Sequence, residues 1–223
     1  MSGALLVPVK SMGNAKQRLA EALDQPHRTQ LAEAMLRDVL TAASRVAHRV
    51  DIFLVTGDVS ASALAEEFAF GVIEDLRNES ETSAIEKATA WCVSHGYDTT
   101  VVIPGDIPLV TGTELNFVLD AARREGALIA PAYDGRGSNC VVRRPANLIP
   151  LRFGNDSFLP HCEAVRQTGK PLVILEFPGI GLDIDQPHEL DLLLQRDGDT
   201  HTQRLLRAWG HAPLGNAAME SAG

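Results

Sequence analysis

Short apolar runs alternate with longer segments of helical periodicity along most of the chain. The apolar runs predict strands at residues 4–9, 51–56, 70–75, 99–108 and 171–177, and two further strands within residues 127–145. The periodic segments predict helices at residues 28–47, 60–68, 82–96, 111–126, 155–169 and 188–196. Glycine follows several of these helices, as expected for a helix end.

This alternation predicts an α/β protein with three layers and a mostly parallel sheet. We expect a single domain over residues 1–196, a length that can bury a sizeable core. Residues 197–223 contain more Gly, Ala and Pro and lose apolar periodicity, so we expect a weakly ordered C-terminal tail there. In sheets of this kind, ligands bind outside the carboxyl ends of the strands.

Composition narrows the range of partners. Hydrophobic residues make up 45% of the 223 residues, and the net charge of −9 argues against non-specific binding to nucleic acid or to an acidic membrane surface. The N-terminus has no signal-peptide layout, and no run approaches the ~18 apolar residues of a membrane span. Three cysteines without metal-binding spacing favour a reducing, cytoplasmic environment.

Three aspartates follow apolar runs. Asp106 lies in the turn "PGDIP", and Asp183 and Asp185 flank an isoleucine in "GLDID". If the second segment is extended, both of its aspartates point to the same face and repel each other unless a cation lies between them. We interpret these carboxylates as ligands of Mg²⁺, which prefers oxygen. The alternatives are a turn aspartate, a helix cap at Asp185 and a solvated Asp183.

Cations cluster after the first predicted strand. The segment "PVKSMGNAKQRL" places Lys10, Lys16 and Arg18 in or beside a glycine-containing loop, where they could hold the phosphates of a nucleotide. Its spacing matches neither the GxxxxGK[ST] phosphate loop nor GxGxxG. Solvated lysines are the alternative.

Two further segments are rich in small hydrogen-bond donors. Ser138 and Asn139 in "GRGSN", and Gly154 and Ser157 in "FGNDSF", could bind a small anion at a predicted helix N-terminus. A glycine turn and a helix cap at residue 155 or 156 are the alternatives. His161 on the same helix could face this anion or pack in the core.

Taken together, the segments "PVK…AKQRL", "PGDIP", "GRGSN", "FGNDSF" and "GLDIDQPHEL" occur in an order that resembles the guanylyltransferases of coenzyme F420 biosynthesis, the CofC/FbiD family. The resemblance spans roughly residues 4 to 195. It implies the nucleotide-diphospho-sugar transferase fold, which is GT-A-like, and agrees with the predicted alternation of strands and helices.

The resemblance implies a reaction in which a small phosphorylated carboxylic acid attacks the α-phosphate of GTP and pyrophosphate leaves. It assigns Mg²⁺ to Asp106, Asp183 and Asp185. It assigns the substrate carboxylate to Ser138, Gly154 and Ser157, with Asn139 beside them, and the phosphates to Lys10, Lys16 and Arg18. Of these, Lys10, Lys16 and Asp106 are the candidate catalytic residues. A phosphate nucleophile needs no general base, which fits a sequence without a Ser, Cys or His catalytic motif.

The sequence also departs from the family pattern. Ser138 replaces the common threonine, Cys140 replaces a smaller residue, and "RNESETSAIEKA" replaces a Gly-Leu-Asn stretch that normally lines the pocket. The acceptor could therefore be 2-phospho-L-lactate, phosphoenolpyruvate or 3-phospho-D-glycerate, and these departures slightly favour 3-phospho-D-glycerate.

Two other functions remain open at this point. One is a nucleotidyltransferase for a molybdenum cofactor or a sugar phosphate, although the sequence lacks the glycine-rich first loop of those relatives. The other is a non-catalytic nucleotide-binding protein, against which the three aspartates argue. A homodimer, and a downstream enzyme that transfers the phospho-acid unit to the deazaflavin Fo, are partner hypotheses that the sequence does not test.

Overall fold

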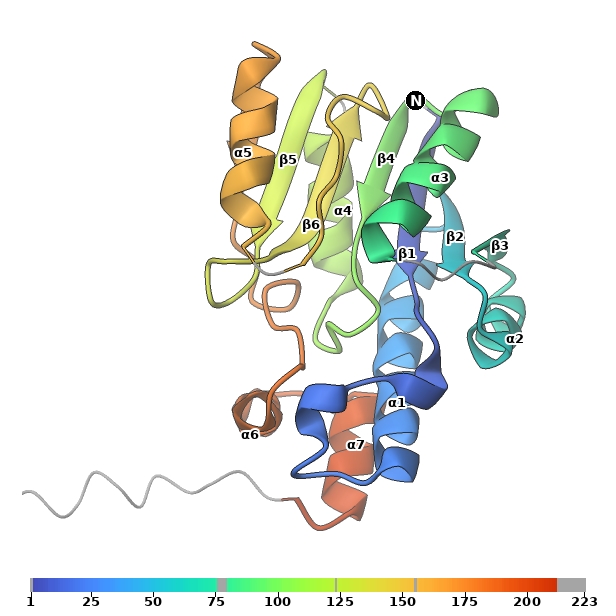
Figure 1. Ribbon diagram of the computed structural model, residues 1–223, viewed down its shortest axis with the longest axis vertical. Helices are drawn as coiled ribbons and strands as arrows, with labels where there is room; N and C mark the ends of the chain where they lie inside the picture. Colours follow the sequence, from blue (N-terminus) through green and yellow to red (C-terminus); the bar gives the residue numbers. More distant parts are fainter. Residues whose placement is uncertain (1, 76–79, 123, 155, 212–223) are drawn as a thin grey trace, which may run out of the picture.

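A computed structural model describes residues 2–75, 80–122, 124–154 and 156–211, and places one seven-stranded sheet at the centre (Figure 1). The strand order is β3-β2-β1-β4-β6-β5-β7. Strand β6 runs antiparallel to β4 and β5, and the other pairings are parallel. The strands are β1 (Gly3–Pro8), β2 (Asp51–Thr56), β3 (Gly71–Glu74), β4 (Thr99–Val102), β5 (Gly126–Pro131), β6 (Ser138–Arg144) and β7 (Leu172–Ile174).

Helices cover both faces of the sheet, which confirms the predicted three-layer α/β fold. Helices α1 (Gln25–Ser44), α2 (Val59–Glu67) and α4 (Gly112–Ala121) pack on one face, and α3 (Glu81–Ser94) and α5 (Phe158–Gln167) pack on the other. The buried strand β1 divides its side chains between the two cores. Leu5 and Val7 enter the first core, and Ala4 and Leu6 enter the second, as the alternation of a strand requires.

A third hydrophobic cluster lies beyond the carboxyl ends of the strands. It joins α1 to the short helix η2 (Gln17–Leu19), and to α6 (Pro187–Gln195) and α7 (His201–Ala208) (Figure 1). A second short helix, η1 (Met12–Asn14), contributes Met12 to the first core. The buried side chains of the third cluster include Leu19, Leu31, Met35, Leu182, Ile184 and Leu206. This cluster fixes the loop after β1 opposite the strand ends, where ligands of such sheets bind.

The expectation of a weakly ordered tail from residue 197 is wrong for residues 201–208, which form α7 beside α1. The buried side of α7 includes Thr202 and Gln203 as well as Leu206, so apolar periodicity alone did not reveal it. Asp38 of α1 accepts hydrogen bonds from the backbone N–H groups of His201 and Thr202 and from the Thr202 hydroxyl, at 2.7, 2.9 and 2.6 Å. Residues 212–223 lie outside the described residues.

No helix in the described part of the chain combines the length and the apolar character that crossing a bilayer requires.

We expect the substitution Asp38→Ala to lower the free energy of unfolding by about 2 kcal/mol, because it leaves the N–H of His201 and the buried N–H and hydroxyl of Thr202 without their acceptor. Urea unfolding followed by circular dichroism measures this loss. Glu33→Ala, which changes an exposed acid on the same helix, is the matched control and should stay within about 0.5 kcal/mol of the wild type. Equal effects of the two substitutions would contradict the role given to Asp38.

Candidate active site

The segment "GLDID" leaves a turn at Gly181 and lies without regular secondary structure against the loop after β4. The backbone N–H of Ile184 donates to the carbonyl oxygen of Asp106 at 3.1 Å, but no strand is formed here. Leu182 and Ile184 are buried in the third hydrophobic cluster, while Asp183 and Asp185 line a cavity on the opposite side. The predicted alternation therefore holds, and two carboxylates point the same way.

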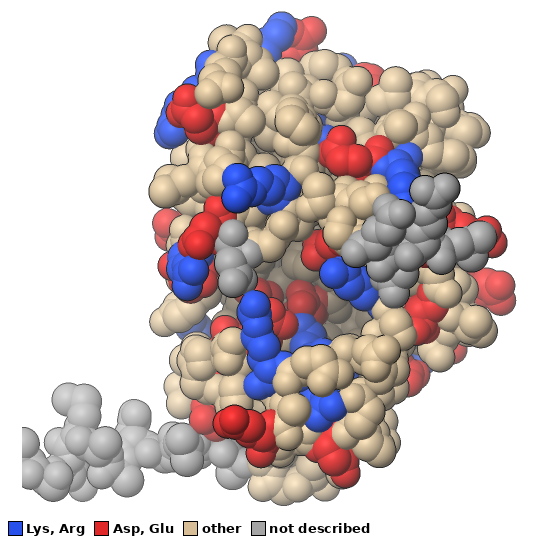
Figure 2. Space-filling view, viewed as in Figure 1, with Lys and Arg blue, Asp and Glu red and all other residues tan. Residues whose placement is uncertain are grey.

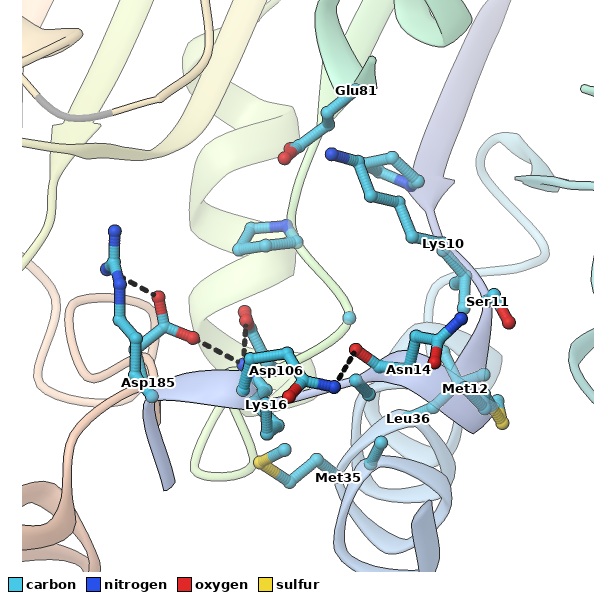
Figure 3. Close-up of a pocket in the computed structure, with 18 residues that line it drawn as sticks. Lys10, Ser11, Met12, Asn14, Lys16, Met35, Leu36, Glu81, Asp106 and Asp185 are labelled. Atoms are coloured by element: carbon cyan, nitrogen blue, oxygen red, sulfur yellow. Dashed lines mark hydrogen bonds and ion pairs between the residues drawn. The ribbon is translucent and has the colours of Figure 1, made fainter. Parts of the chain in front are cut away.

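The cation is a lysine side chain, and it lies between Asp185 and Asp106 and not between Asp185 and Asp183. Lys16 Nζ lies 2.5 Å from Asp106 Oδ2 and 2.8 Å from Asp185 Oδ1 (Figure 3). Lys16 has a left-handed backbone, with φ of 55°, and only 8% of its side chain is exposed. Burial alone would lower the pKa of Lys16, but the two carboxylates outweigh it and raise the pKa. Burial likewise opposes ionisation of Asp185, and the Lys16 charge overcomes it to lower the Asp185 pKa.

Asp183 has no ion-pair partner among the described residues, and one oxygen of Asp106 is also unpaired. Asp106 Oδ1 is buried and has no hydrogen-bond partner among the described residues. Burial, followed by the negative charge of Asp106, raises the pKa of Asp183 to about 6. Asn139 Nδ2 donates to Asp183 Oδ1 at 2.9 Å and also contacts the carbonyl oxygens of Ile180 and Gly181. Asn139, predicted to bind substrate, thus holds the segment that carries Asp183.

These contacts bear on the predicted metal site. Within the described residues, no three Asp, Glu, His or Cys side chains are grouped as a metal site would need, so the structure does not assemble the expected three-aspartate cluster. Asp185 is turned to Lys16 and to Arg18, whose Nη1 lies 3.3 Å from Asp185 Oδ2. The unpaired Asp106 oxygen beside Asp183 still fits one divalent cation that takes its other ligands from phosphate and water.

Two cavities meet at Asp106 and Asp185, and a hollow flanked by charged side chains is visible on the surface (Figure 2). The first cavity, of about 350 Å³, lies between the loop after β1 and helix α1 and includes Lys10, Lys16 and Arg18. Its apolar wall includes Met35 and Leu36. This combination suits a ligand with both an apolar and an anionic part.

The second cavity, of about 630 Å³, contains the predicted anion-binding residues Ser138, Gly154 and Ser157. Gly154 has φ of +124°, a conformation that residues with a side chain rarely adopt. The predicted cap at residue 156 is wrong: Asp156 forms an ion pair with Arg136 at 2.6 Å, and Ser157 occupies the N-cap position without a side-chain cap bond. Residue 155 lies outside the described residues.

Glu81 is a site residue that sequence reasoning missed. It is the first residue of α3, lines both cavities, and points towards the same space as Lys10 (Figure 3). Burial, followed by the charge of Asp106, raises the pKa of Glu81 to about 7. The sequence feature that could have indicated Glu81 is its position directly after Ser80, which caps the helix that follows the third strand. Glu81 belongs to the atypical "RNESETSAIEKA" segment, of which residues 77–79 lie outside the described residues.

Arg136 is a second missed residue. It lies in the "GRGSN" turn and lines the second cavity beside Ser138. The sequence could have indicated Arg136 by its position between two glycines of a predicted loop.

Comparison with known proteins decides the family. The model of the family described as "Guanylyl transferase CofC like" matches residues 3–213. This chain belongs to the CofC-like guanylyltransferase family. It is therefore a nucleotidyltransferase.

Two curated relatives cover most of both chains. A phosphoenolpyruvate guanylyltransferase of Roseiflexus castenholzii is 34% identical over 202 residues, which are 91% of this chain and 92% of the relative. A 2-phospho-L-lactate guanylyltransferase of Methanothermobacter thermautotrophicus is 30% identical over 207 residues, with coverages of 93% and 91%.

The fold also agrees with solved structures. A protein of Desulfovibrio desulfuricans described as a nucleotide-diphospho-sugar transferase superposes with a TM-score of 0.75 at 22% identity, covering 93% of this chain and 95% of that one. This similarity confirms the predicted fold of the CofC-like chain.

We expect Lys16→Met to destabilise the protein by about 2 kcal/mol at pH 7.5. Its loss removes the cation between two carboxylates and leaves only the exposed Arg18 beside Asp185, at a cost that water reduces because Asp185 is one-third exposed. The carboxylate pKa values rise in the variant, so the deficit should shrink as pH falls towards 5 and one carboxylate takes up a proton. Chemical unfolding at both pH values measures this change.

The control is Lys170→Met, which removes an exposed lysine 2.6 Å from Glu125. It should cost less than about 0.5 kcal/mol at either pH. A Lys16→Met deficit that does not depend on pH would contradict the electrostatic explanation.

Proposed function

We propose that this protein transfers GMP from GTP to a small phosphorylated carboxylic acid and releases pyrophosphate, in a reaction that depends on Mg²⁺. The observation that carries the proposal is the buried, unpaired Asp106 oxygen beside Asp183, placed where a cationic loop and two cavities meet. One cavity suits the nucleotide, the other suits the acceptor, and the reacting phosphates would lie between them.

The chemistry explains the set of residues. A phosphate monoester has its second pKa near ~6, so at neutral pH it is mostly a dianion that can attack without a general base. The barrier is the mutual repulsion of anions, which cations lower by neutralising charge and by holding the two phosphates in line. Lys10, Lys16 and Arg18 lie along the first cavity and are suited to bind the triphosphate.

Asp106 and Asp183 are the residues that would hold Mg²⁺. When bound there, the ion supplies Lewis-acid stabilisation of the charge that develops on the transferred phosphate. The raised pKa of Asp183, about 6, marks a carboxylate that lacks a cation and that a metal would keep ionised. Lys16 already balances Asp185, so one divalent ion suffices for the remaining negative charge.

The acceptor would occupy the second cavity. Ser138, Ser157 and the backbone at Gly154 are suited to a carboxylate, and the N-terminal end of α5 favours negative charge there. The two curated relatives are named for phosphoenolpyruvate and 2-phospho-L-lactate, so these acids rank first as acceptors. 3-Phospho-D-glycerate remains a candidate because of Ser138 and the "RNESETSAIEKA" segment. The product of each acceptor would serve coenzyme F420 biosynthesis, in the cytoplasm.

The first test is pyrophosphate release from GTP and Mg²⁺ with each of the three phospho-acids. We expect turnover with at least one acid, and a loss of at least about 100-fold in kcat for Asp183→Asn, because one carboxylate that would hold the ion becomes neutral. Asp51→Asn, which changes an aspartate at the opposite end of the sheet, is the matched control and should retain full activity.

Full activity of Asp183→Asn would contradict the metal assignment. Turnover with CTP and a pterin or sugar acceptor, but with none of the phospho-acids, would replace the proposed reaction by that of a related nucleotidyltransferase. Binding of GTP without turnover of any acceptor would favour a non-catalytic role.

A second test removes the metal. We expect a chelator to abolish pyrophosphate release and excess Mg²⁺ to restore it, because Asp106 and Asp183 would otherwise face the triphosphate as uncompensated negative charges. Thermal denaturation provides a readout besides activity. Mg²⁺ with GTP should raise the melting temperature more than GTP with chelator, and the difference should vanish in Asp183→Asn.

A further inference from the structure

His161 links two elements of the second cavity through buried hydrogen bonds. It lies in the first turn of α5, and its Nδ1 is 3.0 Å from Ser138 Oγ at the start of β6. Its other ring nitrogen, Nε2, accepts a hydrogen bond from the backbone N–H of Arg152 at 2.9 Å. His161, Ser138 and Ser157 are 1%, 6% and 2% exposed. The mechanism above does not use this histidine.

The partners of His161 determine where its proton is. A backbone N–H can only donate, so Nε2 must present its lone pair to Arg152, and in the neutral ring the proton is then on Nδ1. Burial, followed by the nearby positive charge of Arg143, lowers the pKa of His161 to about 4, which keeps the ring neutral at physiological pH. Nδ1–H therefore donates to Ser138 Oγ.

The direction of the hydrogen bond from His161 determines that the serine hydroxyls act as donors towards the cavity. Because Ser138 Oγ accepts from His161, its own proton is available for another acceptor, and the described residues offer none. Ser157 Oγ likewise accepts a hydrogen bond, from the backbone N–H of Ser138 at 2.9 Å, and keeps its own proton available. Both serines line the second cavity. Two hydroxyls that the protein holds as donors match an anion, whose oxygens can only accept.

We propose that His161 is a positioning residue for the acceptor: it holds the Ser138 hydroxyl as a hydrogen-bond donor towards the carboxylate of the phospho-acid. This inference rests on the proposed function. His161 does not touch the substrate, and acts through Ser138. Its effect is on recognition of the acceptor and not on the nucleotide, which we assign to the other cavity.

Two substitutions separate the two ring nitrogens. In the His161→Asn variant, the side-chain amide nitrogen takes the place of Nδ1 and can still donate to Ser138. In His161→Gln, the longer side chain reaches the place of Nε2 and can accept a hydrogen bond from the backbone N–H of Arg152. The Ser138 hydroxyl then loses the hydrogen bond that His161 Nδ1 donates to it. We expect His161→Gln to raise the KM for the acceptor about 10- to 100-fold, the effect of losing one well-placed hydrogen bond to a charged group. His161→Asn should stay within about threefold of the wild type, and the KM for GTP should not change in either variant.

A double-mutant cycle tests the path through Ser138. Ser138→Ala should raise the KM for the acceptor, and adding His161→Gln should raise it no further. Independent, additive effects would overturn the proposal. So would equal changes in the two His161 variants, or an equal rise in the KM for GTP, since these patterns indicate a merely structural role.

One measurement needs neither activity nor a variant. Nitrogen-15 correlation spectra of the histidine rings in the wild-type protein should show His161 as the neutral tautomer with its proton on Nδ1 at pH 7. A proton on Nε2 would overturn the proposal even if the enzyme is active. Absence of pyrophosphate release with the correct tautomer would instead contradict the proposed function, so the two failures are distinguishable.

Discussion

The site is organised by one ion-pair network, in which the Lys16 ammonium lies between the carboxylates of Asp106 and Asp185. These residues come from three distant parts of the chain: the loop after β1, the loop after β4 and the segment before α6. Without a cation, two carboxylates held this close would repel each other. The network therefore holds these three segments together and balances part of the negative charge of the site. Arg18, from the same loop as Lys16, extends the network through its contact with Asp185.

The charge pattern also explains how a protein with a net charge of −9 could bind anions. The loop after β1 supplies Lys10, Lys16 and Arg18 to the first cavity. The second cavity shares Lys10 and Arg18 and adds Arg136 together with the neutral donors Ser138 and Ser157. Asp183, which accepts a hydrogen bond from Asn139 and has no ion-pair partner in the described part of the chain, lies near the junction of the two environments. A ligand with separated anionic groups would find a different type of partner for each group, and this difference can orient it.

Much of this arrangement could be predicted from local pattern. The alternation of strands and helices predicted the layers, and the period of two in "GLDID" predicted that Leu182 and Ile184 face the core. The position of Lys16 could not be predicted, because its left-handed backbone and its long side chain depend on contacts 90 and 169 residues away. Helix α7 was missed because it buries Thr202 and Gln203. His161 was left open between packing and ligand binding, since only the fold brings Arg152 and Ser138 to its two nitrogens.

The third hydrophobic cluster has a consequence for how the chain is made. Its first members, such as Leu31 and Met35, leave the ribosome early, whereas their partners Leu182, Ile184 and Leu206 are added near the end of synthesis. Until then, this face of α1 lacks the cover of those three side chains, and Lys16 lacks its partner Asp185. The nascent protein therefore exposes this apolar face for most of its translation, a period in which chaperones can bind it and early termination leaves it uncovered.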